Sequence, residues 1–323
     1  QIFNQKPKSD YKPDNRIAVN FAKYMVDTFN GYFIGNPIKI SVDDDAAGNI
    51  KKYVELLDQY NDQDDNNAEL SKICCIYGKG YEMYYVDELG NIGITYLTPF
   101  DAFMIYDDSV LCRERYFVRL YIDSKDVLHG SVSDDTKVRW FTQKGKLVWE
   151  EEKKIHGFDG VPATEYAENK ERTCIFEPVM SMIDAYNKAI SEKSNDVDYF
   201  ADAYMKILGT MLGNDEVEHI RDNRIINFDG DANQLIVDFL NKPDGDTTQE
   251  HLIDRLEKLI FQIGMVANIS DENFGTSSGI ALKYKLLAMT NLAKTKERKF
   301  KAGMERRYRL IFSNALSKVQ SDS

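Results

Sequence analysis

Carboxylates are the most abundant residues of this sequence that could do chemistry. With 53 Asp and Glu residues, paired carboxylates of the kind a metal-dependent nuclease needs would arise by chance anywhere in the chain. The sequence contains no G-x-S-x-G, H-E-x-x-H, G-x-x-x-x-G-K-[ST] or G-x-G-x-x-G motif. Its four histidines are scattered, without a recognisable nucleophile and base beside them. We therefore expect no enzyme, no catalytic residue and no cofactor.

The densest acidic segment runs from Asp43 to Asp65. It lacks the regular spacing and the bidentate Glu of a calcium loop, so we interpret it as a solvated helix and loop and expect no metal site. Gly78-Lys79-Gly80 is too short for a phosphate loop and is interpreted as a turn. The four cysteines, among them the vicinal pair Cys74-Cys75, are interpreted as buried small hydrophobes of a reducing compartment.

Hydrophobic periodicity divides the first half of the chain into a helix and a β-rich block. Apolar residues at helical spacing predict a helix over 15–34, followed by a short strand at 38–40. From 73 to about 166 the period changes to two, with turn chemistry at 89–91 and 143–145. This pattern predicts antiparallel hairpins without a βαβ rhythm, and hence an α+β fold.

Long helices dominate the second half. We predict a helix over 178–208 that kinks or changes its surroundings at the wholly polar stretch 191–196. Two strands at 224–228 and 234–239 come next, and a further helix covers 249–267. No apolar run approaches the roughly 18 residues of a membrane span, and no signal peptide is visible, so we expect no membrane partner.

The last predicted helix, from Ile280 onward, is strongly basic. Unbroken for about 35 residues, it would extend about 50 Å. This end of the chain carries eleven Lys and Arg residues against three Asp and Glu, a net +8, whereas the whole chain carries −12. Either the two parts face different partners, or one solvated helix balances an acidic body; charge alone does not decide.

Three segments, in this order and spacing, resemble the portal proteins of long-tailed bacteriophages that infect Gram-positive bacteria. Residues 15–40 (NRIAVNFAKYMVDTFNGYFIGNPIKI) are similar to that family's N-terminal helix and the strand after it. Residues 176–208 (FEPVMSMIDAYNKAISEKSNDVDYFADAYMKIL) look like its first stem helix. Residues 277–311 (SSGIALKYKLLAMTNLAKTKERKFKAGMERRYRLI) look like the long helix after its tunnel loop.

The resemblance implies a portal-protein fold without the family's C-terminal crown. Its parts would be a wing over 1–175, a stem helix over 176–208, a clip over 209–247, a second stem helix over 248–267, a tunnel loop over 268–279 and a long basic helix over 280–323 that returns to the wing. The chain would be one subunit of a dodecameric ring at a capsid vertex of the virion, assembled in the cytoplasm of the bacterial host.

Such a ring implies specific partners. Double-stranded DNA would pass through it during packaging and ejection. The terminase large subunit, which hydrolyses the ATP, and a head-tail adaptor would dock on it, and the major capsid and scaffolding proteins would surround it.

Three sets of residues are the candidates for contact with these partners. We hypothesise weak, replaceable DNA contacts from the tunnel loop, at Asp271, Glu272, Asn273, Phe274 and Thr276, although an ordinary interhelical connection is the alternative. Lys283 and Lys285 are candidates for channel-facing charges. Eight cations repeated around a ring would grip DNA strongly, so we favour pairing with a neighbouring subunit over DNA binding for Lys294, Lys296, Arg298, Lys299, Lys301, Arg306, Arg307 and Arg309.

Two function classes other than a portal remain open from the sequence. A metal-dependent nuclease could use the surplus carboxylates, and an intracellular scaffold could be built on the long helices without any DNA role.

Overall fold

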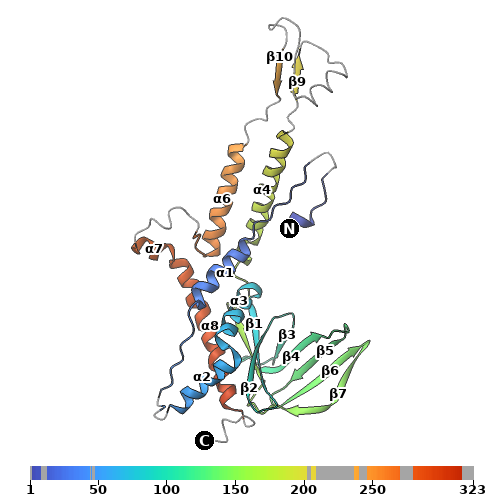
Figure 1. Cartoon of the computed structure of the whole chain (residues 1–323), viewed down its shortest axis with the longest axis vertical. Helices are drawn as coiled ribbons and strands as arrows, with labels where there is room; N and C mark the ends of the chain where they lie inside the picture. Colours follow the sequence, from blue (N-terminus) through green and yellow to red (C-terminus); the bar gives the residue numbers. More distant parts are fainter. Residues whose placement is uncertain are drawn as a thin grey trace. The chain divides into compact units, whose positions relative to one another are not determined.

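Two compact units make up the chain in this computed structural model (Figure 1). Unit 1 comprises Gln1–Val19 and Ser181–Ile260, and unit 2 comprises Asn20–Met180 and Phe261–Ser323. The residues that the structure describes are 2–8, 13–43, 45, 48–201, 205–208, 236–239, 246–269 and 279–314.

Unit 2 is built on two antiparallel sheets. In the three-stranded sheet, β1 (Lys79–Val86) lies between β2 (Ile92–Leu97) and β8 (Ala163–Ala167). The five-stranded sheet has its strands in chain order: β3 (Ala102–Tyr106), β4 (Glu114–Ile122), β5 (Leu128–Ser133), β6 (Lys137–Lys144) and β7 (Lys146–Ile155). The predicted turns are confirmed at Gly90 and Gly145, whose positive φ of 80° and 73° allow tight connections. The α+β prediction is therefore confirmed.

Helices cover one side of the three-stranded sheet (Figure 1). α3 (Gln63–Tyr77) packs on β1, and α8 (Leu287–Phe312) packs on β8. α1 (Phe21–Ile34) contacts both of these helices, α2 (Asn49–Asn61) leads into α3, and α7 (Gly279–Lys285) leads into α8. The helical layer therefore joins segments that lie far apart in the sequence.

The pleat of β1 separates two cores. Tyr81 and Met83 pack towards the five-stranded sheet, in a cluster with Phe117. Tyr84, on the opposite side of the strand, packs with Ile92 and Leu310. Successive side chains of a strand point to opposite faces, so one short strand supplies both layers.

Several predicted boundaries in unit 2 are wrong. The first helix begins at Phe21 because the Asn20 side chain accepts the Lys23 N–H at 2.9 Å and caps it there. Residues 38–40 form no strand, and Tyr77 ends α3 rather than lying in a strand. The long basic helix is interrupted at Leu286, whose ψ of −4° departs from the helical value, although its carbonyl still accepts the Thr290 N–H at 2.8 Å. The cysteine interpretation fails at Cys112, which is exposed.

Unit 1 contains most of two helices that lie side by side, α4 (Met180–Ala201) and α6 (Asp246–Gly264) (Figure 1). Lys193 of α4 forms an ion pair with Glu250 of α6, and the Gln249 amide donates to Asp196 at 3.2 Å. A 3-10 turn, Glu177–Val179, precedes α4.

A two-stranded antiparallel sheet, β9 (Met205–Leu208) with β10 (Ile236–Phe239), follows in the chain. The prediction of a helix to residue 208 is therefore wrong. Residues 205–208 pair with Ile236–Phe239 as a strand, and that pairing replaces the helix. The strand predicted at 236–239 is present, whereas the one predicted at 224–228 lies outside the described residues.

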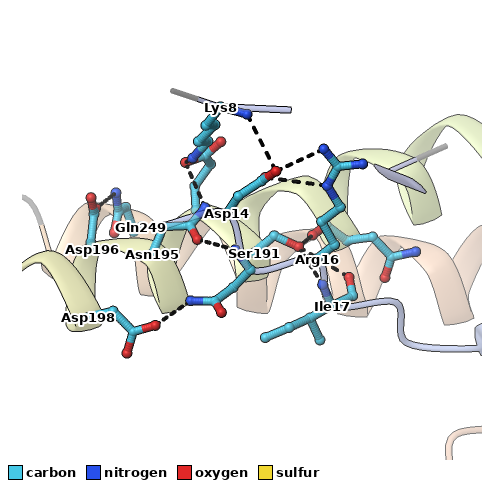
Figure 2. A network of polar contacts seen from close by, with 12 residues as sticks. Lys8, Asp14, Arg16, Ile17, Ser191, Asn195, Asp196, Asp198 and Gln249 are labelled. Carbon is cyan, nitrogen blue, oxygen red and sulfur yellow. Dashed lines mark hydrogen bonds and ion pairs between the residues drawn. The ribbon is translucent and has the colours of Figure 1, made fainter. Parts of the chain in front are cut away.

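An extended N-terminal segment docks along the polar face of α4 (Figure 2). Buried polar side chains one helical turn apart accept the backbone N–H groups of alternate residues: Val19 to Asn187 at 2.8 Å, Ile17 to Ser191 at 2.9 Å and Asn15 to Asn195 at 2.6 Å. The polar stretch 191–196 is thus a docking face, and α4 continues through it as a single helix. Because these amides are bound by α4, residues 15–19 have no need of helical hydrogen bonds.

A buried ion pair fastens α8 to the sheet of unit 2. Arg307 and Glu82 are at most 1% exposed, and the guanidinium binds both carboxylate oxygens, each at 2.7 Å. The Arg307 Nη2 also donates to Asn67 at 2.7 Å, and Glu82 accepts the hydroxyls of Tyr84 and Tyr166. Burial alone would lower the pKa of Arg307, but attraction to Glu82 outweighs it and the pKa is raised.

A second buried cation lies three turns earlier on the same face of α8. Lys296 is 1% exposed; its ammonium lies 2.7 Å from Glu168 and donates to the Ser71 carbonyl and the Cys75 sulfur. The rings of Phe29 and Phe33, on α1, also face the ammonium. Burial lowers the pKa of Lys296, but its attraction to Cys75 and Glu168 outweighs burial, so the net pKa is raised.

We expect Glu82→Gln to destabilise unit 2 by about 3–5 kcal/mol, because the neutral amide leaves the Arg307 guanidinium buried without its counterion. Urea unfolding of the full chain measures the change. The matched control is Glu55→Gln, which breaks an exposed pair with Lys51 and should cost at most about 0.5 kcal/mol. Equal effects for the two variants would contradict this role of Glu82.

Two glycines inside helices should respond to alanine in opposite directions. A Cβ on Gly303 of α8 would lie 2.5 Å from the Tyr166 ring, so Gly303→Ala should destabilise by about 1–3 kcal/mol. A Cβ on Gly31 of α1 meets nothing within 4 Å, so Gly31→Ala should stabilise by about 0.5–1 kcal/mol. Thermal unfolding measures both, and a stabilising Gly303→Ala would contradict the close packing of α8 on β8.

Candidate functional site

The tunnel-loop candidates cannot be placed. Asp271, Glu272, Asn273, Phe274 and Thr276 lie outside the described residues. Lys283 and Lys285 are on α7, and both side chains are exposed.

The eight-residue basic cluster does not form one surface. Lys296 and Arg307 are buried against carboxylates of their own chain, as described above. Arg306 is partly buried, forms an ion pair with Glu114 at 3.3 Å and donates to the carbonyls of Val161 and Ala163. The hypothesis of pairing with a neighbouring subunit is therefore wrong for Lys296 and Arg307, which are buried, while Arg306 already has partners within unit 2.

The other five cations of the cluster are exposed, and four of them line up. Lys294, Arg298, Lys301 and Arg309 follow one another after four, three and eight residues, which places them on one face of α8. That face is opposite to the one with Lys296 and Arg307. We call these four residues the α8 stripe; Lys299, also exposed, lies to one side of it. None of the four forms an ion pair with the described part of the chain.

An acidic pocket of about 290 Å³ lies in unit 2 between α2, α3 and residues 37–40. Asp62 and Asp64 are exposed at its rim, whereas Asp58 is half-buried and Gln63 is only 2% exposed. Burial raises the pKa of Asp58, although Arg307 lowers it in part. The sequence interpretation of this acidic segment as merely solvated missed the pocket. In the sequence, the pocket is marked only by Gln63, which stands among the acidic residues. The burial of Gln63 depends on tertiary packing and could not be predicted from the sequence.

A larger pocket of about 540 Å³ lies between the two sheets of unit 2, and Ser131, Ser133 and His156 are among its lining residues. The His156 Nε2 lies 3.1 Å from the Asp134 carbonyl, which can only accept, so this nitrogen carries the proton. The Nδ1 accepts the Phe158 N–H at 3.2 Å. Burial also lowers the pKa of His156. Main-chain groups thus occupy both ring nitrogens, which leaves this histidine no free nitrogen to act as a base.

The described ranges show neither a metal site nor a membrane span. Within them, no group of three His, Cys, Asp or Glu side chains is arranged to hold a metal ion. No helix there combines the length and apolarity that crossing a membrane requires.

Comparison with known proteins identifies the family of the chain. Residues 1–319 match the family model described as phage portal protein, SPP1 Gp6-like. A curated relative, the "Portal protein" of Clostridium phage phiCD119, is 23% identical over 301 residues, which cover 84% of this chain and 65% of the relative. The chain thus spans slightly less than two thirds of that relative's length. Since the family match extends over nearly the whole sequence, the chain belongs to the SPP1 Gp6-like family of phage portal proteins.

Proposed function

We propose that this chain is a subunit of the ring at a phage capsid vertex, through which double-stranded DNA is packaged and ejected. The family match across residues 1–319 is the observation that supports this proposal most directly. The expected docking of the terminase and the head-tail adaptor, and the ring of twelve subunits, belong to the same proposal. The family is a structural component of phage assembly, in keeping with the expectation that the chain is not an enzyme.

The chain's parts can be assigned within this proposal. Residues 1–175 would be the wing, the helices α4 and α6 the stem, the segment between these helices the clip and 268–279 the tunnel loop. The strand pair β9 and β10, which lies between α4 and α6 in the sequence, supports a β-containing clip. The bound N-terminal segment along α4 suggests that residues 13–19 act with the stem rather than with the wing.

The charge of the chain suits a channel that guides DNA without holding it. Each Lys or Arg committed to a phosphate adds salt-dependent affinity through counterion release, so a uniformly basic channel would retain its cargo. The net charge is −12, and three cations of the basic cluster are neutralised by their own chain. Within this proposal we assign the exposed Lys283 and Lys285 to the channel.

The exposed members of the basic cluster have another role in this proposal. Lys294, Arg298, Lys299, Lys301 and Arg309 contact the neighbouring subunit instead of DNA. An interface between subunits can use charges that a DNA channel cannot, because the interface has to hold while DNA has to move.

The first test is the oligomeric state of the purified full chain. Native mass spectrometry and negative-stain microscopy should give a closed ring with a central hole. A monomer that cleaves DNA in the presence of Mg²⁺ would contradict the proposal and favour a nuclease. A non-ring assembly without affinity for DNA would instead favour a scaffold.

The second test concerns the charges expected in the channel. Asp271→Ala with Glu272→Ala should slow DNA packaging at low salt, because the loop then repels phosphates less. The difference should shrink near 1 M salt, where charges are screened within about 3 Å. The double variant Lys283→Ala with Lys285→Ala removes positive rather than negative charge. It should therefore change the packaging rate at low salt in the opposite direction. Packaging rates that are unchanged at low salt in both double variants would contradict these assignments.

A further inference from the structure

The pocket of about 540 Å³ between the two sheets of unit 2 has small polar side chains at its centre. Ser131 and Ser133 lie on β5, the middle strand of the five-stranded sheet, and point to the same face because they are two residues apart. Their neighbours on the adjacent strands are larger: Arg119 and Trp140 lie opposite Ser131, and Val138 lies opposite Ser133. Small residues between large ones therefore leave this part of the sheet hollow.

The hydroxyls of Ser131 and Ser133 form no hydrogen bond with the part of the chain that the structure describes. The two residues are 8% and 5% exposed, and both line the pocket. Neither hydroxyl oxygen is fully enclosed, so a molecule inside the pocket can reach it. A buried hydroxyl without a partner costs free energy that an alanine or a valine would avoid. These hydroxyls therefore indicate that the pocket receives a polar occupant.

The charged side chains that line the pocket are both positive. They are Arg119 of β4 and Lys154 of β7, and no Asp or Glu is among the lining residues. Within the described ranges these cations contact aromatic rings and no carboxylate: Arg119 lies 4.9 Å from the ring centre of Tyr121, and Lys154 lies 5.7 Å from that of Trp140. His156 is neutral at pH 7, because burial lowers its pKa. A cavity with two cations and no acid, in a chain of net charge −12, attracts an anion.

Much of the remaining lining is apolar or aromatic. Trp140 and Val138 belong to the five-stranded sheet, and Met83 and Tyr85 belong to β1 of the other sheet. The Tyr85 ring lies over Gly93 of β2, where even a Cβ would come within 2.2 Å of it. Pockets of this size, with apolar walls and a few polar groups, typically hold a small organic ligand. The walls therefore suit a flat apolar body next to the anionic group.

We propose that this pocket binds a small aromatic anion, that is, a phosphate or carboxylate group carried on a flat ring. The anionic group accepts hydrogen bonds from Ser131, Ser133 and the guanidinium of Arg119, which strengthens these bonds because it is charged. The ring lies against Trp140, and Lys154 adds a second positive charge beside it. All of these residues belong to unit 2 of one chain, so the inference does not depend on the proposed ring.

Fluorescence titration of the full chain tests the proposal. The chain has two tryptophans, so Trp149→Phe leaves Trp140 as the only indole and makes its emission report on the pocket. Phenyl phosphate and phenylacetate carry different anionic groups on the same ring, whereas benzyl alcohol lacks the charge and inorganic phosphate lacks the ring. At least one of the two aromatic anions should bind with a Kd of about 1 mM or tighter, and at least about fivefold more tightly than either incomplete probe. The tighter of the two identifies the anionic group.

Two variants separate a binding role from a structural one. Ser131→Ala with Ser133→Ala removes hydroxyls that have no partner in the described chain, so thermal stability should stay unchanged or rise. The same double variant should weaken binding of the aromatic anion at least about fivefold. Arg119→Met should weaken it by a similar factor and reduce its dependence on salt. If Arg119→Met does not fold, the serine variant alone decides.

Matched controls lie on the opposite face of the same sheet. Arg139 and Lys153 precede Trp140 and Lys154 in the chain, face each other across β6 and β7, and do not line the pocket. Arg139→Met and Lys153→Met should each change the Kd by less than about threefold. Because Arg119→Met and Arg139→Met remove the same charge, a difference between them excludes a general effect of net charge.

Three outcomes overturn the inference. Both aromatic anions could bind more weakly than about 1 mM, which would make the pocket a water-filled cavity only. Benzyl alcohol or inorganic phosphate could bind as tightly as they do, which would remove the need for a charge and a ring together. Finally, the serine double variant could keep the wild-type affinity within about fivefold, which would place the bound probe elsewhere. None of these outcomes bears on ring formation, which is measured separately.

Discussion

The buried pair between Arg307 and Glu82 is the interaction on which unit 2 depends. The carboxylate sits on the central strand of the three-stranded sheet and binds groups from α3, β1, β8 and α8. Desolvating two charges is costly, and the cost is recovered only where every remaining donor and acceptor finds a partner in good geometry. The bidentate contact and the two tyrosine hydroxyls satisfy most of these groups, although the buried Arg307 Nη1 has no hydrogen-bond partner in the described part of the chain. They also specify the register in which α8 lies on the sheet.

One helix therefore has two electrostatic roles on its two faces. Lys296 and Arg307 are neutralised in the interior, where they determine how the helix packs against α1, α3 and the sheet. The α8 stripe keeps its charge in solvent, where only a partner can use it. The net positive charge of α8 alone therefore does not distinguish its buried cations from its exposed ones. Charges of the same sign, only two residues apart as in Lys294 and Lys296, lie on different faces of the helix and therefore differ in what they contact.

A portal must hold its neighbours firmly and its DNA weakly. In the proposed ring these demands fall on different residues: exposed cations of α8 contact the adjacent subunit, and a largely acidic chain surrounds the DNA. In unit 1, side chains of α4 are already occupied by the N-terminal segment and by α6. The polar face of α4 is thus partly an internal contact of the chain and not a surface left open to water.

The sequence by itself determined the α+β class, the antiparallel hairpins, the main helices and the family, because period, turn residues and segment order are local or linear properties. It did not determine where helices end. α1 begins at Phe21 rather than at residue 15, and residues 205–208 pair as a strand, because tertiary partners competed for the same backbone groups. Tertiary structure alone decided which cations are buried. The spacing of Lys296, Phe300 and Arg307 on one helical face was visible in the sequence, but the carboxylates that make their burial tolerable come from residues 82 and 168. Only folding brings those charges together.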